Sequence, residues 1–155
     1  MNEGNGRTKI KVLLKHRFQA RAQVLSQTRS AVRDCLVNDG YPSVLVDDVV
    51  LAIDEACQNI IRHAYCGETE QEILLHITRH ESHLEITLLD FAPSVSPDCL
   101  KPRDLEDVRP GGLGAHLIQE VMDDVSLAPF PHRQGNVMRM TKLVKRDPGT
   151  VIRKP

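Results

Sequence analysis

Residues 51–65, LAIDEACQNIIRHAY, combine an apolar helical pattern with side chains that can take part in chemistry. Glu55 offers a carboxylate, Asn59 a carboxamide four residues later, and His63 an imidazole four residues further on. Residues four apart on an α-helix lie on the same face, one turn above another. This polar row is either the solvated side of an amphipathic helix or one wall of a binding site, and the helix alone leaves both interpretations open.

A second acidic side chain, Asp90, ends the largely apolar run LEITLL and precedes a loop rich in proline. A carboxylate at the end of a buried strand can accept a hydrogen bond from an amine, such as the exocyclic amino group of a nucleobase. An Asx turn or a helix cap would use the same carboxylate, so this alternative also stays open.

Three glycines, Gly111, Gly112 and Gly114, stand where the apolar helical pattern resumes in GGLGAHLIQEVMDDV. Glycine lets backbone N–H groups approach a phosphate closely, and the start of a helix favours negative charge. Turns need glycine as well. The proline-rich loop, the glycines and the helix start together indicate a phosphate-binding segment more specifically than the glycines alone.

Three helices that could position these residues are predicted from apolar residues recurring every three or four positions. The first runs from residue 17 to about residue 36, with Phe18 in its apolar stripe. The second begins at Ser43 as its N-cap and runs to about Tyr65, where Gly67 gives a stop signal. The third follows the glycine segment.

Strands are predicted where apolar and polar residues alternate. They fall at residues 9–15, 72–79, 83–90, 126–130 and 136–144. The order of strand, two helices, hairpin, loop, helix and hairpin fits an α+β two-layer sandwich, with a mixed, mostly antiparallel sheet covered by helices on one face. We expect one domain over residues 9–145, a disordered N-terminus at 1–8, a mobile lid near 92–110 and a polar tail at 146–155.

The composition restricts the class of protein. The 155 residues carry a net charge of -1, which predicts neither nucleic acid nor an acidic membrane surface as a partner. Neither a membrane-spanning apolar run nor a signal-peptide pattern is found. The four cysteines lack CxxC spacing, so reduced thiols and a cytoplasmic location are expected, with Cys57 a small buried residue.

Three histidines, His76, His80 and His83, surround the predicted turn between the strands at 72–79 and 83–90. Their spacing crosses the turn, and the sequence suggests no carboxylate or thiol that completes the set. We therefore expect a solvated turn in preference to a metal site.

EACQN followed by HAY, DFAP at a strand end, and GGLGAHLIQEVMDDV together resemble the anti-sigma-factor serine/threonine kinases. These are small bacterial regulators of sporulation and stress responses within the GHKL ATPase superfamily, and the resemblance covers residues 9–144. It implies a GHKL (Bergerat) fold that binds ATP and Mg²⁺. It also implies a kinase that phosphorylates a small anti-sigma-factor antagonist and sequesters a sigma factor or an equivalent target. Members of the family commonly form homodimers.

The same resemblance implies roles for individual residues. Asn59 would bind Mg²⁺, because a carboxamide oxygen is a suitable hard ligand. Glu55 would be the general base, or would orient the substrate hydroxyl, in phosphoryl transfer. Asp90 would hydrogen-bond the adenine amino group, and His63 would support the site unless it is a core or capping histidine. The lid that closes on the phosphates would include Gly111, Gly112, Leu113 and Gly114.

The sequence departs from the superfamily pattern after Asp90. The usual motif is Asp-x-Gly, whereas this chain has Asp90-Phe91-Ala92-Pro93, and alanine disfavours positive φ. Ala92 therefore keeps open a second hypothesis, a nucleotide-dependent partner-binding switch without kinase activity. A detached ATPase domain of a sensor kinase is a third hypothesis, and the lack of an obvious autophosphorylation histidine counts against it.

Overall fold

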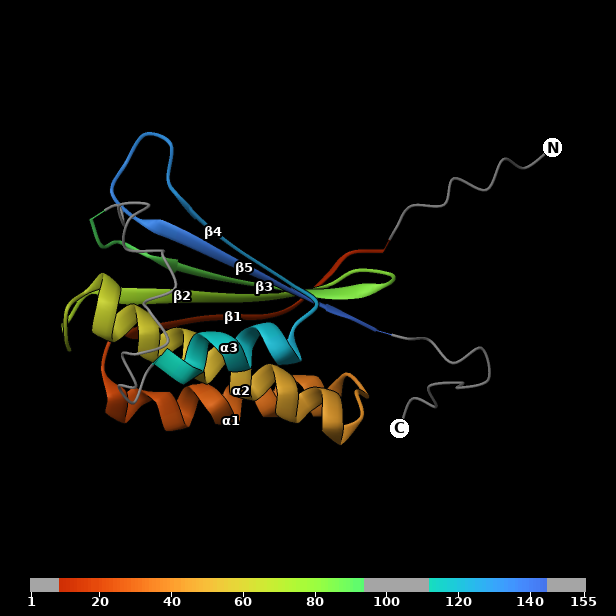
Figure 1. Ribbon diagram of the computed structural model, residues 1–155. Helices are drawn as coiled ribbons and strands as arrows, with labels where there is room; N and C mark the ends of the chain where they lie inside the picture. Colours follow the sequence, from red (N-terminus) through yellow and green to blue (C-terminus); the bar gives the residue numbers. More distant parts are fainter. Residues whose placement is uncertain (1–8, 94–111, 145–155) are drawn as a thin grey trace.

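The protein is a two-layer α+β sandwich in which the helices cover one face of a five-stranded sheet (Figure 1). The computed structural model describes residues 9–93 and 112–144, without the side chains of residues 112–115. The predicted N-terminal segment 1–8, most of the predicted lid and the predicted tail lie outside the described residues. No helix in the described part of the chain is long and apolar enough to cross a membrane.

The sheet has the strand order β1-β2-β3-β5-β4. The strands are β1 Lys11–Gln19, β2 Glu72–Arg79, β3 His83–Asp90, β4 Asp124–Pro129 and β5 Asn136–Leu143. Each neighbouring pair is antiparallel, which confirms the mostly antiparallel sheet and leaves no parallel pair among the described strands. The β2–β3 hairpin has the predicted bounds because both strands alternate buried apolar and half-buried residues along their length.

The first strand is longer than predicted, and the assignment of Phe18 to a helix is wrong. β1 continues to Gln19, and Phe18 pairs with Ile73 of β2 with its ring buried in the core. Pairing along β2 explains the difference, because burial against a neighbouring strand outweighs a local helical spacing. The helical region begins only with a 3-10 turn at Ala22–Val24.

The three helices are α1 Leu25–Asn38, α2 Ser43–Asn59 and α3 Gly112–Val121. α2 is prolonged by a π-helical turn, Ile60–Ala64, so that the helical segment ends next to Tyr65 as predicted. The prediction of Ser43 as N-cap is wrong. Pro42 holds the extended N-cap conformation, its carbonyl accepts the first helical hydrogen bond from Val46, and the cap has no side-chain hydrogen bond.

The core lies between the helices and the sheet. Apolar side chains from α1, α2, β2, β3, α3 and β5 meet there and are almost fully buried. They include Leu36, Val49, Ile53, Leu75, Ile86, Ile118 and Met140. Cys57 is buried in α2 as predicted. Only three described polar residues are buried, namely Thr28, Asp90 and Asn136, and two of these meet at one end of the sheet.

Candidate functional site

The row of Glu55 and Asn59 on α2 differs from a solvated helix face. Both residues are half-buried, and the side-chain oxygen Oδ1 of Asn59 is buried without a hydrogen-bond partner. Glu55 forms no hydrogen bond or ion pair with any described residue. A buried acceptor without a partner typically costs about 1–3 kcal/mol, so such atoms in folded proteins call for a ligand or another explanation. A carboxamide oxygen of this kind suits Mg²⁺, which prefers hard oxygen ligands.

The neighbouring acidic residue on the same helix has a structural role instead. The Asp54 carboxylate accepts hydrogen bonds from Arg29 of α1 at 2.7 Å and from Gln58 at 2.8 Å. These contacts tie α1 to α2 on the side next to the row. Asp54 and Gln58 therefore form a packing stripe on α2, whose hydrogen bonds hold the helices together. Glu55 and Asn59 take no part in these contacts and are available to a ligand.

The π-helical turn follows directly after Asn59. Its signature is the hydrogen bond from Tyr65 N to Ile60 O, at 3.0 Å, and such turns occur frequently at functional sites. His63 lies in this turn and is exposed, so its supporting role stays a prediction. The two residues after Tyr65 have positive φ, Cys66 at 58° and Gly67 at 132°, in line with the predicted stop at Gly67.

Asp90 ends β3 with its side chain 3% exposed. Its Oδ1 accepts hydrogen bonds from the backbone N–H of Ala92 at 3.0 Å and from Asn136 Nδ2 at 2.9 Å. The contact with Ala92 is an Asx turn, so that alternative is present in the structure. It engages one of the two carboxylate oxygens, so it does not prevent Asp90 from accepting an amine. Burial raises the pKa of Asp90, while the hydrogen bonds from Asn136 and Ala92 act in the opposite direction.

Alanine fits at position 92 without conformational strain. Ala92 is fully buried, and Cys66 is the only non-glycine residue with positive φ in the described ranges. The backbone after Asp90 therefore needs no glycine here, and the sequence-based concern about Ala92 loses its conformational basis.

Two side chains that the sequence analysis did not single out hold the backbone next to Asp90. The Tyr65 hydroxyl donates to the carbonyl of Glu72 at 2.7 Å and accepts from the N–H of Phe91 at 2.8 Å. Gln134 Nε2 donates to the carbonyl of Phe91 at 2.9 Å. Burial raises the pKa of Tyr65. Tyr65 thus connects the helical segment that carries Asn59 to the strand end that carries Asp90.

The turn between β4 and β5 approaches Asp90 through a glycine. Gly135 has φ +138°, and a Cβ atom there would lie 2.5 Å from the Asp90 carbonyl oxygen and 2.5 Å from the Phe130 ring. The signal in the sequence that could have indicated this turn is QGN at residues 134–136. Its close approach to Asp90 depends on the pairing of β3 with β5, which brings Asp90 opposite Asn136.

The glycine segment is described only in part. Gly111 lies outside the described residues, Gly112 is the first residue of α3, and Leu113 and Gly114 are in its first turn. The predicted helix start is confirmed, while contact with phosphates stays a prediction. α3 packs against α2, with Ile118 and Met122 in the core. Among the described residues, no hydrogen bond joins Glu55 or Asn59 directly to Asp90.

The sandwich is that of a histidine kinase-like ATPase domain. The family model of that description matches residues 18–142, and the chain belongs to this family. Its curated relatives include the serine-protein kinases RsbW of Bacillus thuringiensis (strain Al Hakam) and Bacillus mycoides (strain KBAB4). Each is 31% identical over 139 residues, a match that spans 84% of this chain and 84% of the relative. The resemblance to the kinases of the GHKL superfamily is confirmed.

Two solved structures share the fold. The SiaB–SiaC complex from Pseudomonas aeruginosa matches with a TM-score of 0.60 and 18% identity, over 84% of this chain and 89% of that chain. The RsbU and RsbW domains of Rv1364c from Mycobacterium tuberculosis match with a TM-score of 0.60 and 14% identity. That match covers 88% of this chain and 32% of the longer mycobacterial chain.

Proposed function

We propose that this chain is a serine/threonine protein kinase of a partner-switching system that uses ATP and Mg²⁺. In this proposal it phosphorylates a small anti-sigma-factor antagonist and sequesters a sigma factor or an equivalent target in the cytoplasm. The observation that carries the proposal is the unpartnered, buried Oδ1 of Asn59, one helical turn from the half-buried carboxylate of Glu55. An oxygen without a partner beside an unpaired carboxylate suits a site for a cation and a reacting hydroxyl.

Asn59 would hold the metal through Oδ1. Mg²⁺ bound there would supply positive charge that neutralises the phosphate oxygens during transfer. The rest of the Asn59 environment supports this role, because Ile60 and Ile61 are buried next to it and fix the helix against the core. The residue is therefore held in place before any ligand binds, which reduces the entropy lost on binding.

Asp90 would recognise the adenine. Its carboxylate oxygen Oδ1 is occupied by Ala92 and Asn136, and the group can accept the exocyclic amine through its remaining acceptor capacity. Tyr65 and Gln134 fix the following residue, Phe91, through its N–H and its carbonyl. The acceptor is thus held in one orientation, which favours adenine over a base that presents a carbonyl oxygen at the same position.

Glu55 would act on the substrate hydroxyl. In the proposed step a bond forms between the serine or threonine oxygen and the γ-phosphorus, and the bond from that phosphorus to the bridging oxygen of ADP breaks. The hydroxyl proton passes to the Glu55 carboxylate. General-base assistance of this kind typically contributes about 10²–10⁴-fold in rate, and the remainder comes from positioning and charge.

Two comparisons support a protein as the substrate. The relatives at 31% identity are named serine-protein kinases, and a structural neighbour was solved as a complex of SiaB with SiaC. The alternative of a nucleotide-dependent switch without kinase activity rested on Ala92, and the backbone at Ala92 needs no positive φ.

The decisive experiment compares three variants on α2. Wild type, Glu55→Gln, Asn59→Ala and the control Gln58→Ala are incubated with labelled ATP, Mg²⁺ and an antagonist encoded beside this gene. Phosphoserine or phosphothreonine is then measured, and Mg-ADP affinity is measured by calorimetry. We expect Glu55→Gln to lose about 10²–10⁴-fold in transfer rate with ADP affinity retained. Asn59→Ala should lose Mg²⁺-dependent affinity.

The control variant distinguishes loss of a side chain in the proposed site from a general disturbance of α2. Gln58 binds Asp54 on the packing stripe, so Gln58→Ala should retain both transfer and affinity apart from a small loss of stability. A wild-type protein that binds ATP but leaves the antagonist unmodified would refute the kinase and leave the switch. Equal Mg-ADP affinity for wild type and Asn59→Ala would refute the metal role.

A further inference from the structure

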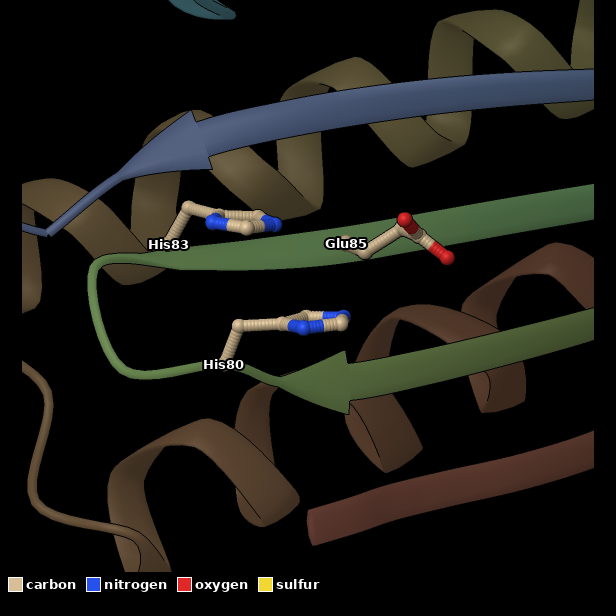
Figure 2. A group of neighbouring side chains, drawn as sticks. All are labelled: His80, His83 and Glu85. Carbon is tan, nitrogen blue, oxygen red and sulfur yellow. The ribbon is translucent and has the colours of Figure 1, made fainter. Parts of the chain in front are cut away.

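A second group of metal-binding side chains lies at the turn between β2 and β3. The imidazoles of His80 and His83 and the carboxylate of Glu85 offer ligand atoms that all lie within 4.8 Å of one another. Figure 2 shows the three side chains in front of β2 and β3, with the helices behind the sheet. The expectation that no carboxylate completes the histidine set is wrong, because Glu85 follows His83 by two residues and so projects from the same face.

The hairpin itself builds this arrangement. His80 N donates to His83 O at 2.9 Å, which makes the two histidines the pair that closes the turn. Residues directly opposite each other on antiparallel strands have Cβ atoms about 4.5–5.5 Å apart. The two rings accordingly stack with centroids 4.4 Å apart and an interplanar angle of 7° (Figure 2).

One ring nitrogen of this pair lacks a partner. His80 Nε2 is buried and forms no hydrogen bond. Burying an imidazole nitrogen away from water without a new hydrogen-bond partner costs free energy, and ring stacking does not replace the lost hydrogen bond. This observation is independent of the spacing of the three residues, and it points to a ligand that takes the nitrogen lone pair.

The second histidine also has a nitrogen to offer. His83 Nδ1 lies 3.3 Å from the Ser82 hydroxyl, so that a hydrogen bond from Nδ1–H to the hydroxyl leaves Nε2 with a free lone pair. A metal-binding histidine usually donates its other ring N–H to a nearby acceptor in this way. Ser82 would thus set the tautomer that binds a metal.

The third ligand is available because its existing partner is weak. Glu85 Oε1 lies 3.7 Å from Arg139 Nε, and the two side chains are 30% and 55% exposed. Exposed pairs of this kind contribute little to stability, and the carboxylate has a second oxygen. Arg139 could keep one oxygen of Glu85 while a cation takes the other.

We propose that His80, His83 and Glu85 bind a zinc-class divalent transition-metal ion that joins β2 to β3 at their turn. Two imidazoles and one carboxylate suit Zn²⁺ and its neighbours better than Mg²⁺ or Ca²⁺. Bonds of about 2.0–2.2 Å in a tetrahedral site would place the ligand atoms about 3.4 Å apart. Binding would require the two imidazoles to rotate out of their parallel stack so that one ion lies in the plane of each ring, with the fourth position open to water.

The site is separate from the proposed nucleotide site. His83 begins β3 and Asp90 ends it, and a strand rises about 3.3 Å per residue, so the two lie roughly 23 Å apart. Metal binding at the turn and Mg-ADP binding at the other end of the strand are therefore expected to be independent. Failure of the Zn²⁺ titration would therefore leave the proposed kinase function untouched, and failure of the kinase assay would leave the metal site untouched.

The test is a titration of the metal-free 155-residue chain with Zn²⁺ alone, in a Cys66→Ser, Cys99→Ser background that removes the exposed thiol of the described residues and the thiol that lies outside them. We expect one Zn²⁺ per chain in calorimetry and a rise in the melting temperature with Zn²⁺. Glu85→Gln and His83→Asn should each bind at least about tenfold more weakly, since loss of even an outer-shell partner costs about 10–100-fold. His76→Asn is the matched control on the same face of β2, and it should bind like the parent.

Two further measurements keep the test decisive if a variant folds poorly. In the parent protein, Zn²⁺ should shift the imidazole resonances of two of the seven histidines. Co²⁺ in place of Zn²⁺ should give a four-coordinate visible spectrum without a thiolate charge-transfer band. No binding, a thiolate band, or equal affinity in Glu85→Gln and His83→Asn would each overturn the proposal, and Mg-ADP affinity should be the same with and without Zn²⁺.

Discussion

Gly135→Ala should damage both the fold and the proposed nucleotide site, and Gly67→Ala is its matched control. Both glycines have nearly the same backbone conformation, with φ +138° at Gly135 and φ +132° at Gly67. A Cβ atom at Gly67 meets nothing within 4 Å, whereas at Gly135 it would lie 2.5 Å from the Asp90 carbonyl oxygen and 2.5 Å from the Phe130 ring. The pair thus separates backbone strain from steric overlap.

The magnitudes follow from these two terms. A non-glycine residue in this backbone region costs about 1–3 kcal/mol, and this cost applies to both variants. Overpacking against neighbours that cannot move freely adds about 1–3 kcal/mol at Gly135 alone, since one of the neighbours is a backbone atom. For a chain of this size, 1 kcal/mol corresponds to about 2–4 °C in melting temperature. Gly135→Ala should therefore melt roughly 2–12 °C below Gly67→Ala.

The assay is thermal and urea unfolding of wild type and both variants, followed by Mg-ADP titration at a temperature where all three are folded. Gly135→Ala should also weaken ADP binding, because the overlap displaces the backbone of Asp90, while Gly67→Ala should bind like wild type. Equal melting temperatures for the two variants would refute the argument that the turn between β4 and β5 is held tightly against Asp90.

Three further predictions use the described contacts. Tyr65→Phe removes two hydrogen bonds and should destabilise the protein by about 1–3 kcal/mol in urea unfolding; an unchanged midpoint would contradict this. Burial raises the pKa of Asp90 above 3.8, so ADP affinity in titrations should fall on acidification before an ordinary aspartate titrates. The stability that Asp90 contributes is fully present below pH 3.8 and is lost as the pH rises through the raised pKa of the folded protein. Asp90→Asn should therefore not lower the melting temperature at neutral pH. The ADP affinity that remains in Asp90→Asn should not show this pH dependence. Burial also raises the pKa of Cys35, to about 11, and of Cys57, so thiol-labelling mass spectrometry at neutral pH should find Cys66 modified before either; early labelling of Cys57 would contradict its burial.

Local periodicity was sufficient for most of the fold. The β2–β3 hairpin has its predicted bounds because each strand alternates along its whole length, and a period of two leaves little room for another assignment. The β1 boundary was not predictable in the same way. Phe18 fits a helical spacing with the residues that follow it. Its place in β1 is determined by pairing with Ile73 of β2, which lies far along the chain and cannot be inferred from local spacing.

The candidate site was predictable to the extent that it depends on single helices and strand ends. Glu55 and Asn59 are one turn apart on one helix, which spacing alone reveals. Tyr65 and Gln134 could not be found in this way, because they meet at Phe91 only through tertiary contacts. The group around Glu85 was missed for another reason: a two-residue turn places His80 opposite His83, and this register had to be known before the carboxylate could be added.

The π-helical turn at Ile60–Ala64 makes the length of this segment matter more than the identity of its exposed residues. A π-turn contains one residue more than an α-turn would need, as the hydrogen bond from Tyr65 N to Ile60 O shows. If the segment closed into a regular α-helix with no residue removed, the residues after it would be rotated by about 100°, the rotation per residue of an α-helix. The Tyr65 hydroxyl would then turn away from Phe91, and the helix would lose its connection to the end of β3 although every side chain was unchanged. Deleting one residue of the turn removes the extra residue and lets a regular α-helix keep Tyr65 in place, so a single-residue deletion here should be tolerated better than a single-residue insertion.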